Sequence, residues 1–274
     1  MLIAVDTGGT KTLVASFSED GVLESSFKFA TPRTTDDYIL ELHQAIRQIL
    51  TDASPTVITV ALPGIVKNGI AIWCNNLGWK DFDVRTALIS HFPDVPILVE
   101  NDANLAGLAE TRTLEILPDS SLYVTISTGI GTGMITGGVI DPGLRLSEGG
   151  RIQIEFDGMM REWESFASGS AIYKTYGKYA RDIDSEDTWQ QIADRISRGF
   201  LVMVPMIQPD IIIIGGSIGT YFERYREHLT NLLKEKLPDH ITLPVLRQAI
   251  HPEEAVVYGC YYYALDSLTF RHDS

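Results

Sequence analysis

The stretch Asp6-Thr7-Gly8-Gly9-Thr10-Lys11-Thr12 follows the apolar run Leu2-Ile3-Ala4-Val5 and is the first of three glycine-rich turns in the chain. The second is Ser127-Thr128-Gly129-Ile130-Gly131-Thr132-Gly133, and the third is Gly215-Gly216-Ser217-Ile218-Gly219. Each turn comes directly after an apolar strand. Because glycine has no Cβ, consecutive backbone N–H groups in such turns can approach an oxyanion closely. Three turns of this kind predict that the chain binds phosphate groups.

A polar segment, Glu100-Asn101-Asp102, lies between the first two turns and follows the short strand at 97–99. Phosphoryl transfer to an alcohol needs a carboxylate that orients the attacking hydroxyl and takes its proton. Asp102 is the candidate for this general base, and Asn101 is the candidate for binding neighbouring hydroxyls. Asn and Asp are also favoured at helix N-caps, so capping of the helix expected at 103–111 is an alternative role.

Eight segments carry a resemblance that spans almost the whole chain. They are Asp6 to Thr12, Leu62-Pro63-Gly64, Asn76 to Trp79, Val99 to Asn104, the turn at 127–133, Glu148 to Arg151, Trp163 to Gly169, and Gly215-Gly216. In these segments and in their order, the chain resembles the ROK family of sugar kinases, within the actin/hexokinase/Hsp70-like superfamily. The resemblance implies an α/β fold with two lobes, of the actin-like ATPase or ribonuclease-H-like type, and an active-site cleft between the lobes.

Length and hydrophobic periodicity also predict two lobes, residues 1–115 and 116–274. In the first lobe we expect strands at 2–5, 12–17, 22–29, 57–62 and 97–99, and helices at 34–52 and 103–111. In the second we expect two strands within 121–140, a strand at 211–214, and helices at 164–180, 188–206, 218–236 and 253–267. The last helix is expected to pack back on the first lobe.

The glycine turns are expected to bind the nucleotide. The carboxylate of Asp6 would hold a Mg²⁺-bound water, and Thr10, Lys11 and Thr12 would face the transferred phosphate. The full set of phosphate and nucleotide candidates is Asp6, Gly8, Gly9, Thr10, Lys11, Thr12, Thr128, Gly129, Thr132, Gly133, Gly215 and Gly216. The alternative is that the first two turns are plain glycine hairpins and the third a tight turn between a strand and a helix.

Sugars are recognised by side chains that donate to and accept from adjacent hydroxyls. The resemblance places sugar contacts at Glu148 and Glu164, and the remaining candidates are Gly64, Asn76, Asn101, Asp102 and Arg151. The alternative for the two glutamates is a solvated acidic surface. Arg151 has five donors, which favours an anionic or differently oriented substrate, but pairing with Glu148 or Glu155 would explain it equally well.

One departure from the family concerns zinc. Most members carry a histidine at the position of Arg151, followed by a cysteine cluster, and these residues together bind structural Zn²⁺. This chain has no Cys or His between 92 and 227, so a site of the usual nitrogen and sulfur ligands cannot form there. We expect the segment to be held instead by packing of Ile152, Ile154, Phe156, Met159, Met160 and Trp163.

Composition limits the partners. With 22 Lys+Arg and 36 Asp+Glu the net charge is −14, which disfavours nucleic acid and anionic membranes. No apolar run approaches the ~20 residues needed to cross a bilayer. We therefore expect a cytoplasmic protein whose partners are a sugar and ATP, and the resemblance adds a homodimer.

Together these features predict an ATP- and Mg²⁺-dependent kinase that phosphorylates a hexose hydroxyl, most simply the 6-OH of glucose or a related hexose. Alternatives within the class are fructose, mannose or an N-acylated amino sugar as acceptor. The alternative from another class is a non-catalytic sugar-binding sensor. The sequence leaves the sugar and the physiological phosphoryl donor open.

We predict that the protein folds and acts without zinc, since the segment at 148–164 contains no cysteine or histidine. Treatment with a chelator should leave the melting temperature unchanged, and elemental analysis should find well under one zinc per chain. Stoichiometric zinc whose removal abolishes activity would contradict this expectation.

Overall fold

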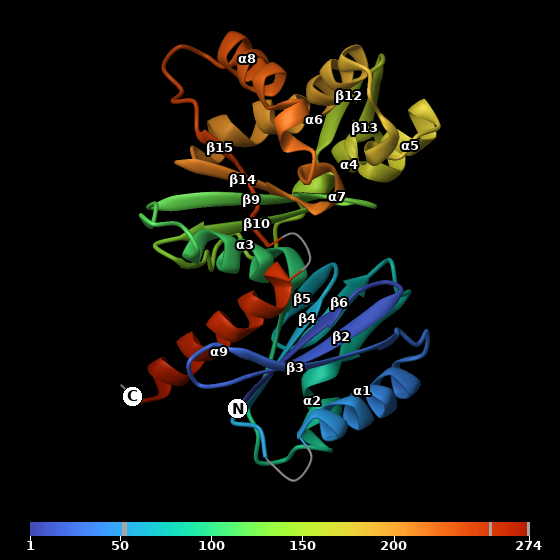
Figure 1. Cartoon of the computed structure of the whole chain (residues 1–274), viewed down its shortest axis with the longest axis vertical. Coiled ribbons are helices and arrows are strands. Elements are labelled where there is room, and N and C mark those ends of the chain that lie inside the picture. The colour runs from blue at the N-terminus through green and yellow to red at the C-terminus, as the bar shows by residue number, and fades with distance from the viewer. Residues whose placement is uncertain (51–53, 252–253, 273–274) are drawn as a thin grey trace. The chain divides into compact units, whose positions relative to one another are not determined.

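The computed structural model describes residues 1–50, 54–251 and 254–272. They form two compact units, Met1–Ala109 with the segment that begins at Glu254, and Glu110–Glu253. Each unit is built around one five-stranded sheet, and Figure 1 shows the elements of both. The boundary at 109/110 precedes the one expected at 115/116, and the last helix belongs to the first unit. No helix in the described part of the chain is long and apolar enough to cross a membrane.

The first unit combines a mixed sheet with flanking helices. Its strands are β1 (Leu2–Thr7), β2 (Lys11–Phe17), β3 (Leu23–Ala30), β4 (Val57–Leu62), β5 (Ile65–Lys67), β6 (Ile70–Cys74), β7 (Trp79–Asp83) and β8 (Ile97–Asn101), and its helices are α1 (Thr35–Leu50), α2 (Val84–Ile89), most of α3 (Asp102–Arg112), and α9 (Ala255–His272). The main sheet has the order β3-β2-β1-β4-β8. A separate antiparallel sheet of β5, β6 and β7 is absent from the predicted elements.

The two faces of the main sheet are covered by different helices. On one face Val5 and Val14 are buried in a common core with Leu42 and Ile46 of α1. On the other face, the ring of Phe17 lies 5.4 Å and 5.3 Å from the rings of Tyr258 and Tyr261 in α9. Helix α9 also lies against β1 and β4, as Figure 1 shows within this unit.

Parallel pairing of β1, β4 and β8 brings their carboxyl ends to one edge of the sheet. Asp6 is in register with Ala61, and Leu62 is in register with Asn101. Because the side chains and loops that follow parallel strands emerge at the same edge, this edge is where Asp6, Gly64 and Asn101 come near one another.

The second unit has its own sheet, with the order β11-β10-β9-β14-β15, in which β9, β14 and β15 are parallel. The strands are β9 (Ser120–Ile126), β10 (Ile130–Thr136), β11 (Val139–Ile140), β12 (Gln153–Phe156), β13 (Met159–Glu162), β14 (Ile211–Gly215) and β15 (Val245–Gln248). The helices are α4 (Trp163–Ala167), α5 (Gly169–Tyr176), α6 (Glu186–Ile207), α7 (Gly216–Gly219) and α8 (Arg226–Lys236), with 3-10 turns at 149–151, 180–182 and 222–224.

Two predicted helices of this unit are divided. The helix expected at 164–180 is α4 and α5, which meet at Ser168, whose hydroxyl accepts the N–H of Ala171 at 3.3 Å and caps α5. Gly177 ends α5 in the left-handed conformation. The helix expected at 218–236 is α7, a 3-10 turn and α8. Apolar spacing does not register such caps, because a side-chain hydrogen bond can stop a helix without changing the pattern.

The segment at 148–164 forms a hairpin, β12–β13, that is held by aromatic packing. Trp163 is fully buried, lies against the Cα of Gly199, and donates its indole N–H to the carbonyl of Arg195 at 3.1 Å. The ring of Phe156 stacks on that of Phe166 with centroids 4.3 Å apart. The expectation that Met159 and Met160 contribute to this packing is wrong, since they are 53% and 63% exposed at the end of the hairpin.

Glu110 ties two distant segments together where the second unit begins. Its buried carboxylate accepts the backbone N–H groups of Ile250 and His251, each at 2.7 Å. Residues 250 and 251 lie just before the point where the chain returns to the first unit. One side chain thus joins both ends of the second unit.

We predict that Glu110→Ala lowers the free energy of unfolding by ~2–4 kcal/mol, because it removes the acceptor of two charge-assisted hydrogen bonds. Urea denaturation followed by circular dichroism measures the change. The matched control is Glu115→Ala, an exposed glutamate whose loss should change the free energy by less than ~0.5 kcal/mol. Equal effects of the two substitutions would show that the hydrogen bonds of Glu110 to Ile250 and His251 do not stabilise the fold.

Candidate functional site

Asp6 lies near the end of β1, at the edge where the parallel strands of the first unit end. Burial raises the pKa of its carboxyl to about 6, and the positive charge of Lys28 lowers it in part. Within the described residues, no hydrogen bond to this carboxylate is present. A half-buried carboxyl group whose pKa is raised and that accepts no hydrogen bond in the described structure is typical of a functional position.

The first glycine turn is closed by backbone and threonine hydrogen bonds. The N–H of Gly8 donates to the carbonyl of Lys11 at 3.0 Å, and the Thr31 hydroxyl donates to the carbonyl of Gly8 at 2.8 Å. Thr12 is fully buried, and its hydroxyl pairs with that of Thr31 at 2.9 Å. The structure therefore corrects the expectation that Thr12 faces a phosphate: it braces the turn, whereas Thr10 and Lys11 are exposed.

Asn76 lies beside this turn. A Cβ built on Gly9 would be 3.4 Å from the Cβ of Asn76, so the two residues are neighbours although 67 positions separate them in the chain (76 minus 9). Asn76 is exposed. Its carbonyl accepts a hydrogen bond from Arg33 at 3.3 Å, which connects this loop to the segment before α1.

Asn101 and Asp102 divide two roles at the start of α3. The side-chain oxygen of Asn101 accepts the N–H of Asn104 at 3.0 Å, so Asn101 is the helix cap. Its amide nitrogen donates to the carbonyl of Gly64 at 2.9 Å. Asp102 is the first residue of α3, is partly exposed, and accepts the N–H of Ala103 at 2.8 Å. Asn101 therefore supplies the N-cap, and one oxygen of Asp102 accepts a further N–H of the first turn.

Glu100 holds Asn101 and Asn104 in place through hydrogen bonds. Its side chain is fully buried, and one carboxylate oxygen accepts the N–H of Asn101 at 2.8 Å and the side-chain amide of Asn104 at 3.0 Å. Gly64 has φ +84°, and a Cβ there would overlap the carbonyl of Trp73. Glycine is therefore required at the position whose carbonyl orients Asn101.

The second glycine turn, residues 127–133, is held from one side by Glu164. One oxygen of this carboxylate accepts the N–H of Ile130 at 2.9 Å, and a Cβ on Gly129 would overlap the same oxygen. The hydroxyl of Thr132 accepts the N–H of Gly149 at 3.0 Å. Thr128 is exposed, whereas Gly133 is buried inside β10. The turn that is predicted to bind phosphate is thus in direct contact with Glu164, which is predicted to bind the sugar.

Arg151 pairs inside the chain, with partners other than those expected. Its Nη1 donates to Glu162 at 2.6 Å and lies 3.2 Å from Glu164. The pKa of Glu148 is raised, chiefly by burial. The positive charge of Arg151 opposes this shift, and the negative charge of Glu164 adds to it. One guanidinium among three carboxylates leaves the group negative, which speaks against an anionic substrate here.

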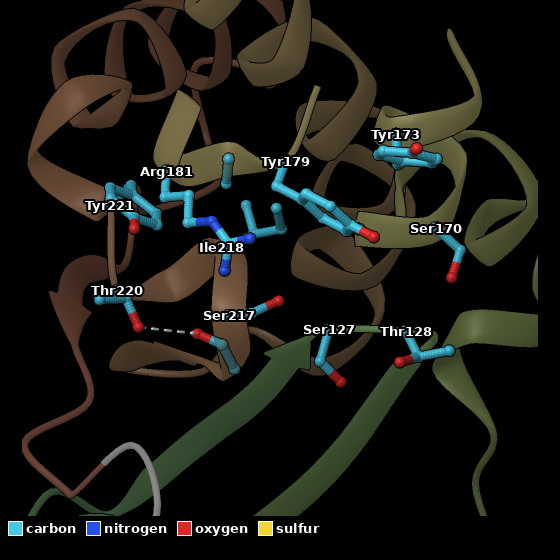
Figure 2. Close-up of a pocket in the computed structure, with 13 residues that line it drawn as sticks. Ser127, Thr128, Ser170, Tyr173, Tyr179, Arg181, Ser217, Ile218, Thr220 and Tyr221 are labelled. Atoms are coloured by element: carbon cyan, nitrogen blue, oxygen red, sulfur yellow. Dashed lines mark hydrogen bonds between the residues drawn. The ribbon is translucent and has the colours of Figure 1, made fainter. Parts of the chain in front are cut away.

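A cavity of about 700 Å³ opens at the carboxyl ends of β9 and β14. Figure 2 shows its lining, in which the hydroxyl groups of Ser127, Thr128 and Ser217 lie along one side and Tyr179 and Arg181 on the other. The Arg181 guanidinium lies 4.9 Å from the ring centre of Tyr179, which stacks on Tyr173 with centroids 4.5 Å apart. The cavity therefore offers hydroxyl groups on one side and flat aromatic surface with a cation on the other.

Three glycines allow the segments around this cavity to approach one another. Gly216 has φ +78°, and a Cβ there would be 2.6 Å from the carbonyl oxygen of Ile126. The N–H of Gly169 donates to the carbonyl of Ser127 at 2.6 Å, and a Cβ there would also be 2.6 Å from that oxygen. Gly215 ends β14 with a Cβ position that meets the ring of Tyr123.

Sequence reasoning missed most of the aromatic side of the cavity. Tyr173, Tyr179, Arg181, Thr220 and Tyr221 line it, yet none belongs to a glycine turn. The available signal in the sequence is the cluster Tyr173, Tyr176 and Tyr179 after Gly169. In the structure, Tyr173 and Tyr179 of this cluster are exposed. Among the described residues, no group of three or more His, Cys, Asp or Glu could hold a metal ion.

Comparisons with known proteins show which family the chain resembles. The sequence profile of the ROK family matches residues 2–267. A kanosamine kinase of Amycolatopsis mediterranei is 30% identical over 78% of this chain and 79% of its own length. An N-acetylmannosamine kinase of Haemophilus influenzae is 26% identical over 97% of this chain and 96% of its own. The crystal structure of a ROK family glucokinase from Streptomyces griseus with glucose and AMPPNP superposes with a TM-score of 0.80, at 22% identity and over 96% and 98% of the two chains.

We predict a pH-dependent stability difference between the wild type and Asp6→Asn. The folded-state pKa of Asp6, about 6, exceeds its ordinary value of 3.8. The folded state therefore loses stability as the pH rises from about 4 to about 6, where only the unfolded state has released this proton, and the full cost persists above pH 6. Asp6→Asn should be of similar stability at pH 4 and more stable than the wild type by ~2–3 kcal/mol at pH 8, at 1.36 kcal/mol per pKa unit.

Urea denaturation of both proteins between pH 4 and pH 8, with a chelator present, measures this difference. Other titrating groups cancel, because they are common to both proteins. Parallel stability curves across this range would show that the Asp6 carboxylate is not buried at a cost.

Proposed function

The chain belongs to the ROK family, and we propose that it is an ATP-dependent kinase that transfers the γ-phosphoryl group to a hydroxyl of a hexose, most simply the 6-OH of glucose or a related hexose. The observation that carries this proposal is the carboxylate of Asp102 at the start of α3, beside an asparagine that already caps the helix. Relatives named as kinases for amino-sugar and N-acylated sugar substrates support the same reaction type.

On the acceptor side, Asp102 is proposed as the general base. Its carboxylate would accept a hydrogen bond from the attacking hydroxyl and take its proton as the oxygen bonds to phosphorus. Asn101 would contribute the remaining hydrogen and lone pair of an amide that is fixed by Gly64 and Asn104. Gly64, Asn76, Glu148 and Glu164 are proposed as further sugar contacts, with Arg151 acting on Glu164 through their ion pair.

On the donor side, the second and third glycine turns and the cavity between them are proposed to bind the nucleotide. A volume of about 700 Å³ is within the range of small-molecule sites. The base and ribose would lie against Tyr179 and Ile218, and the phosphates would be directed toward Thr128 and the N–H groups after it. The residues Gly8, Gly9, Thr10 and Lys11 are proposed to contact the transferred phosphoryl group.

Mg²⁺ is the cofactor that this reaction class requires. A single carboxylate suits it, because Mg²⁺ is commonly bound by one or two carboxylates together with waters and substrate phosphates. Burial raises the pKa of Asp6, and a cation bound beside it would lower that pKa. When bound, the ion would neutralise charge on the phosphates. Asp6 would hold it through water, and the ion in turn would keep Asp6 ionised.

The acceptor sugar is the open part of the proposal. The negative group around Glu148 and Glu164 favours neutral or amino sugars over sugar acids, and the named relatives act on kanosamine and N-acetylmannosamine. Fructose and mannose stay as alternatives, as does a sugar-binding sensor without catalysis. The expectations of a homodimer and of a cytoplasmic location are likewise proposals.

We predict that Asp102→Asn lowers kcat by ~10²–10⁴ while changing the sugar Kd by less than ~10-fold, because it removes the proton acceptor and keeps a hydrogen-bonding group of the same size. The acceptor is first identified by ADP release with glucose, mannose, fructose, kanosamine and N-acetylmannosamine. Calorimetry and kinetics then follow on the mutant.

The control is unfolding of the same mutant, which should be unchanged within ~0.5 kcal/mol since Asn101 supplies the cap. If the mutant keeps more than about a tenth of the wild-type kcat, Asp102 is not the base. Sugar binding without turnover on any of the five sugars would support the sensor instead.

A further inference from the structure

Glu164 connects two groups of residues to which the proposed function gives different ligands. Its Oε2 accepts the N–H of Ile130 at 2.9 Å and lies against the Cα of Gly129, in the turn proposed for the nucleotide. Its Oε1 lies 3.2 Å from Nη1 of Arg151, in the segment proposed for the sugar. Both oxygens of one carboxylate are therefore engaged within the chain.

Arg151 forms an ion pair with this carboxylate. Its Nη1 is shared between Glu162, the last residue of β13, and Glu164, in the first turn of α4. A guanidinium is planar and keeps its charge at any working pH, so it can hold two carboxylates in a defined geometry. Without Arg151, the carboxylates of Glu148, Glu162 and Glu164 would repel one another. Glu164 would also lose the partner that holds its Oε1 and thereby directs its Oε2 to the N–H of Ile130.

The segment around Arg151 is closely packed. Trp163, next to Glu164 in sequence, is fully buried against Gly199, and Phe156 stacks on Phe166. On the opposite side of Ile130, its carbonyl lies against the Cα of Gly150, where a Cβ would overlap it. At the start of β10, the N–H of Ile130 thus lies against Glu164 and its carbonyl against Gly150.

We propose that Arg151 is a positioning residue: by holding Glu164 it fixes the N–H of Ile130, and with it the second glycine turn, in the conformation that receives the nucleotide phosphates. The identity of that ligand rests on the proposed function. The position of the turn does not, so the two can fail separately. Arg151 in this role contacts no nucleotide atom and acts through a side chain that also belongs to the sugar-binding group.

The first test follows the Ile130 amide itself. In Arg151→Met, which keeps a long side chain without charge, hydrogen exchange at the Ile130 N–H measured by NMR should be at least ~10-fold faster than in the wild type. The amides of β9 should keep their protection, because the sheet is unaffected. The matched control is Arg161→Met, which removes an arginine of the same hairpin that has no ion pair with Glu164 in the described structure. Unchanged exchange at Ile130 in Arg151→Met overturns the proposal.

The second test measures the affinity for MgADP by calorimetry in the absence of sugar. We expect Arg151→Met to bind ~10-fold more weakly, Arg151→Lys to bind less than ~3-fold more weakly because the charge is kept, and Arg161→Met to bind as the wild type does. Glu164→Gln combined with Arg151→Met should be no worse than either change alone, since both act on one contact.

These outcomes separate the inference from the proposed function. A wild type that binds no MgADP and turns over no sugar refutes the function, and the exchange rate at Ile130 then decides the inference alone. Normal MgADP affinity in Arg151→Met, together with weakened sugar binding, would make Arg151 a sugar ligand and overturn the positioning role. If Arg151→Met does not fold, the same exchange and affinity measurements on Arg151→Lys and Glu164→Gln decide between the two.

Discussion

Backbone segments of the second unit approach one another more closely than any side chain would allow, and the rest of the site depends on this approach. Gly169 lies on the carbonyl of Ser127, Gly216 on that of Ile126, and Gly150 on that of Ile130. Three different segments, from α5, from the β14–α7 turn and from the 3-10 turn at 149–151, therefore reach the ends of β9 and β10. The first two of these approaches border the cavity, which is lined by Ser127, Gly169 and Gly216 and offers hydroxyl groups that can serve a phosphate.

At the start of α3 in the first unit, hydrogen bonds fix the local geometry. A helix that begins at the end of a parallel strand needs acceptors for its first N–H groups, and here Asn101 supplies the cap. Glu100, buried and hydrogen-bonded to Asn101 and Asn104, fixes the asparagine from below. Burying a carboxylate in this way is costly unless its hydrogen bonds are made. We infer that these hydrogen bonds serve to orient Asp102.

The sequence predicts much of this fold, because long apolar strands and glycine turns are local signals. The main parallel strands, the three turns and the helix after Asp102 could all be derived from residue type and spacing. Thr12 could not be placed, because only the pairing with Thr31 shows that its hydroxyl points into the core. Tyr179 and Arg181 were missed for a related reason: they reach the cavity through a loop and a 3-10 turn that no periodicity describes.

Arg151 illustrates a separation between stability and geometry. Partly exposed ion pairs contribute only ~0–1 kcal/mol to folding, and the side chains of Arg151 and Glu162 are 33% and 40% exposed. The hairpin therefore owes its stability to Trp163, Phe156 and Ile154, which are buried, and little to its charges. An ion pair that adds so little to folding, and yet aligns a carboxylate with one backbone N–H, is best understood by what it orients. In this chain the apolar residues hold the segment in place, and the charged residues determine the direction in which Glu164 faces.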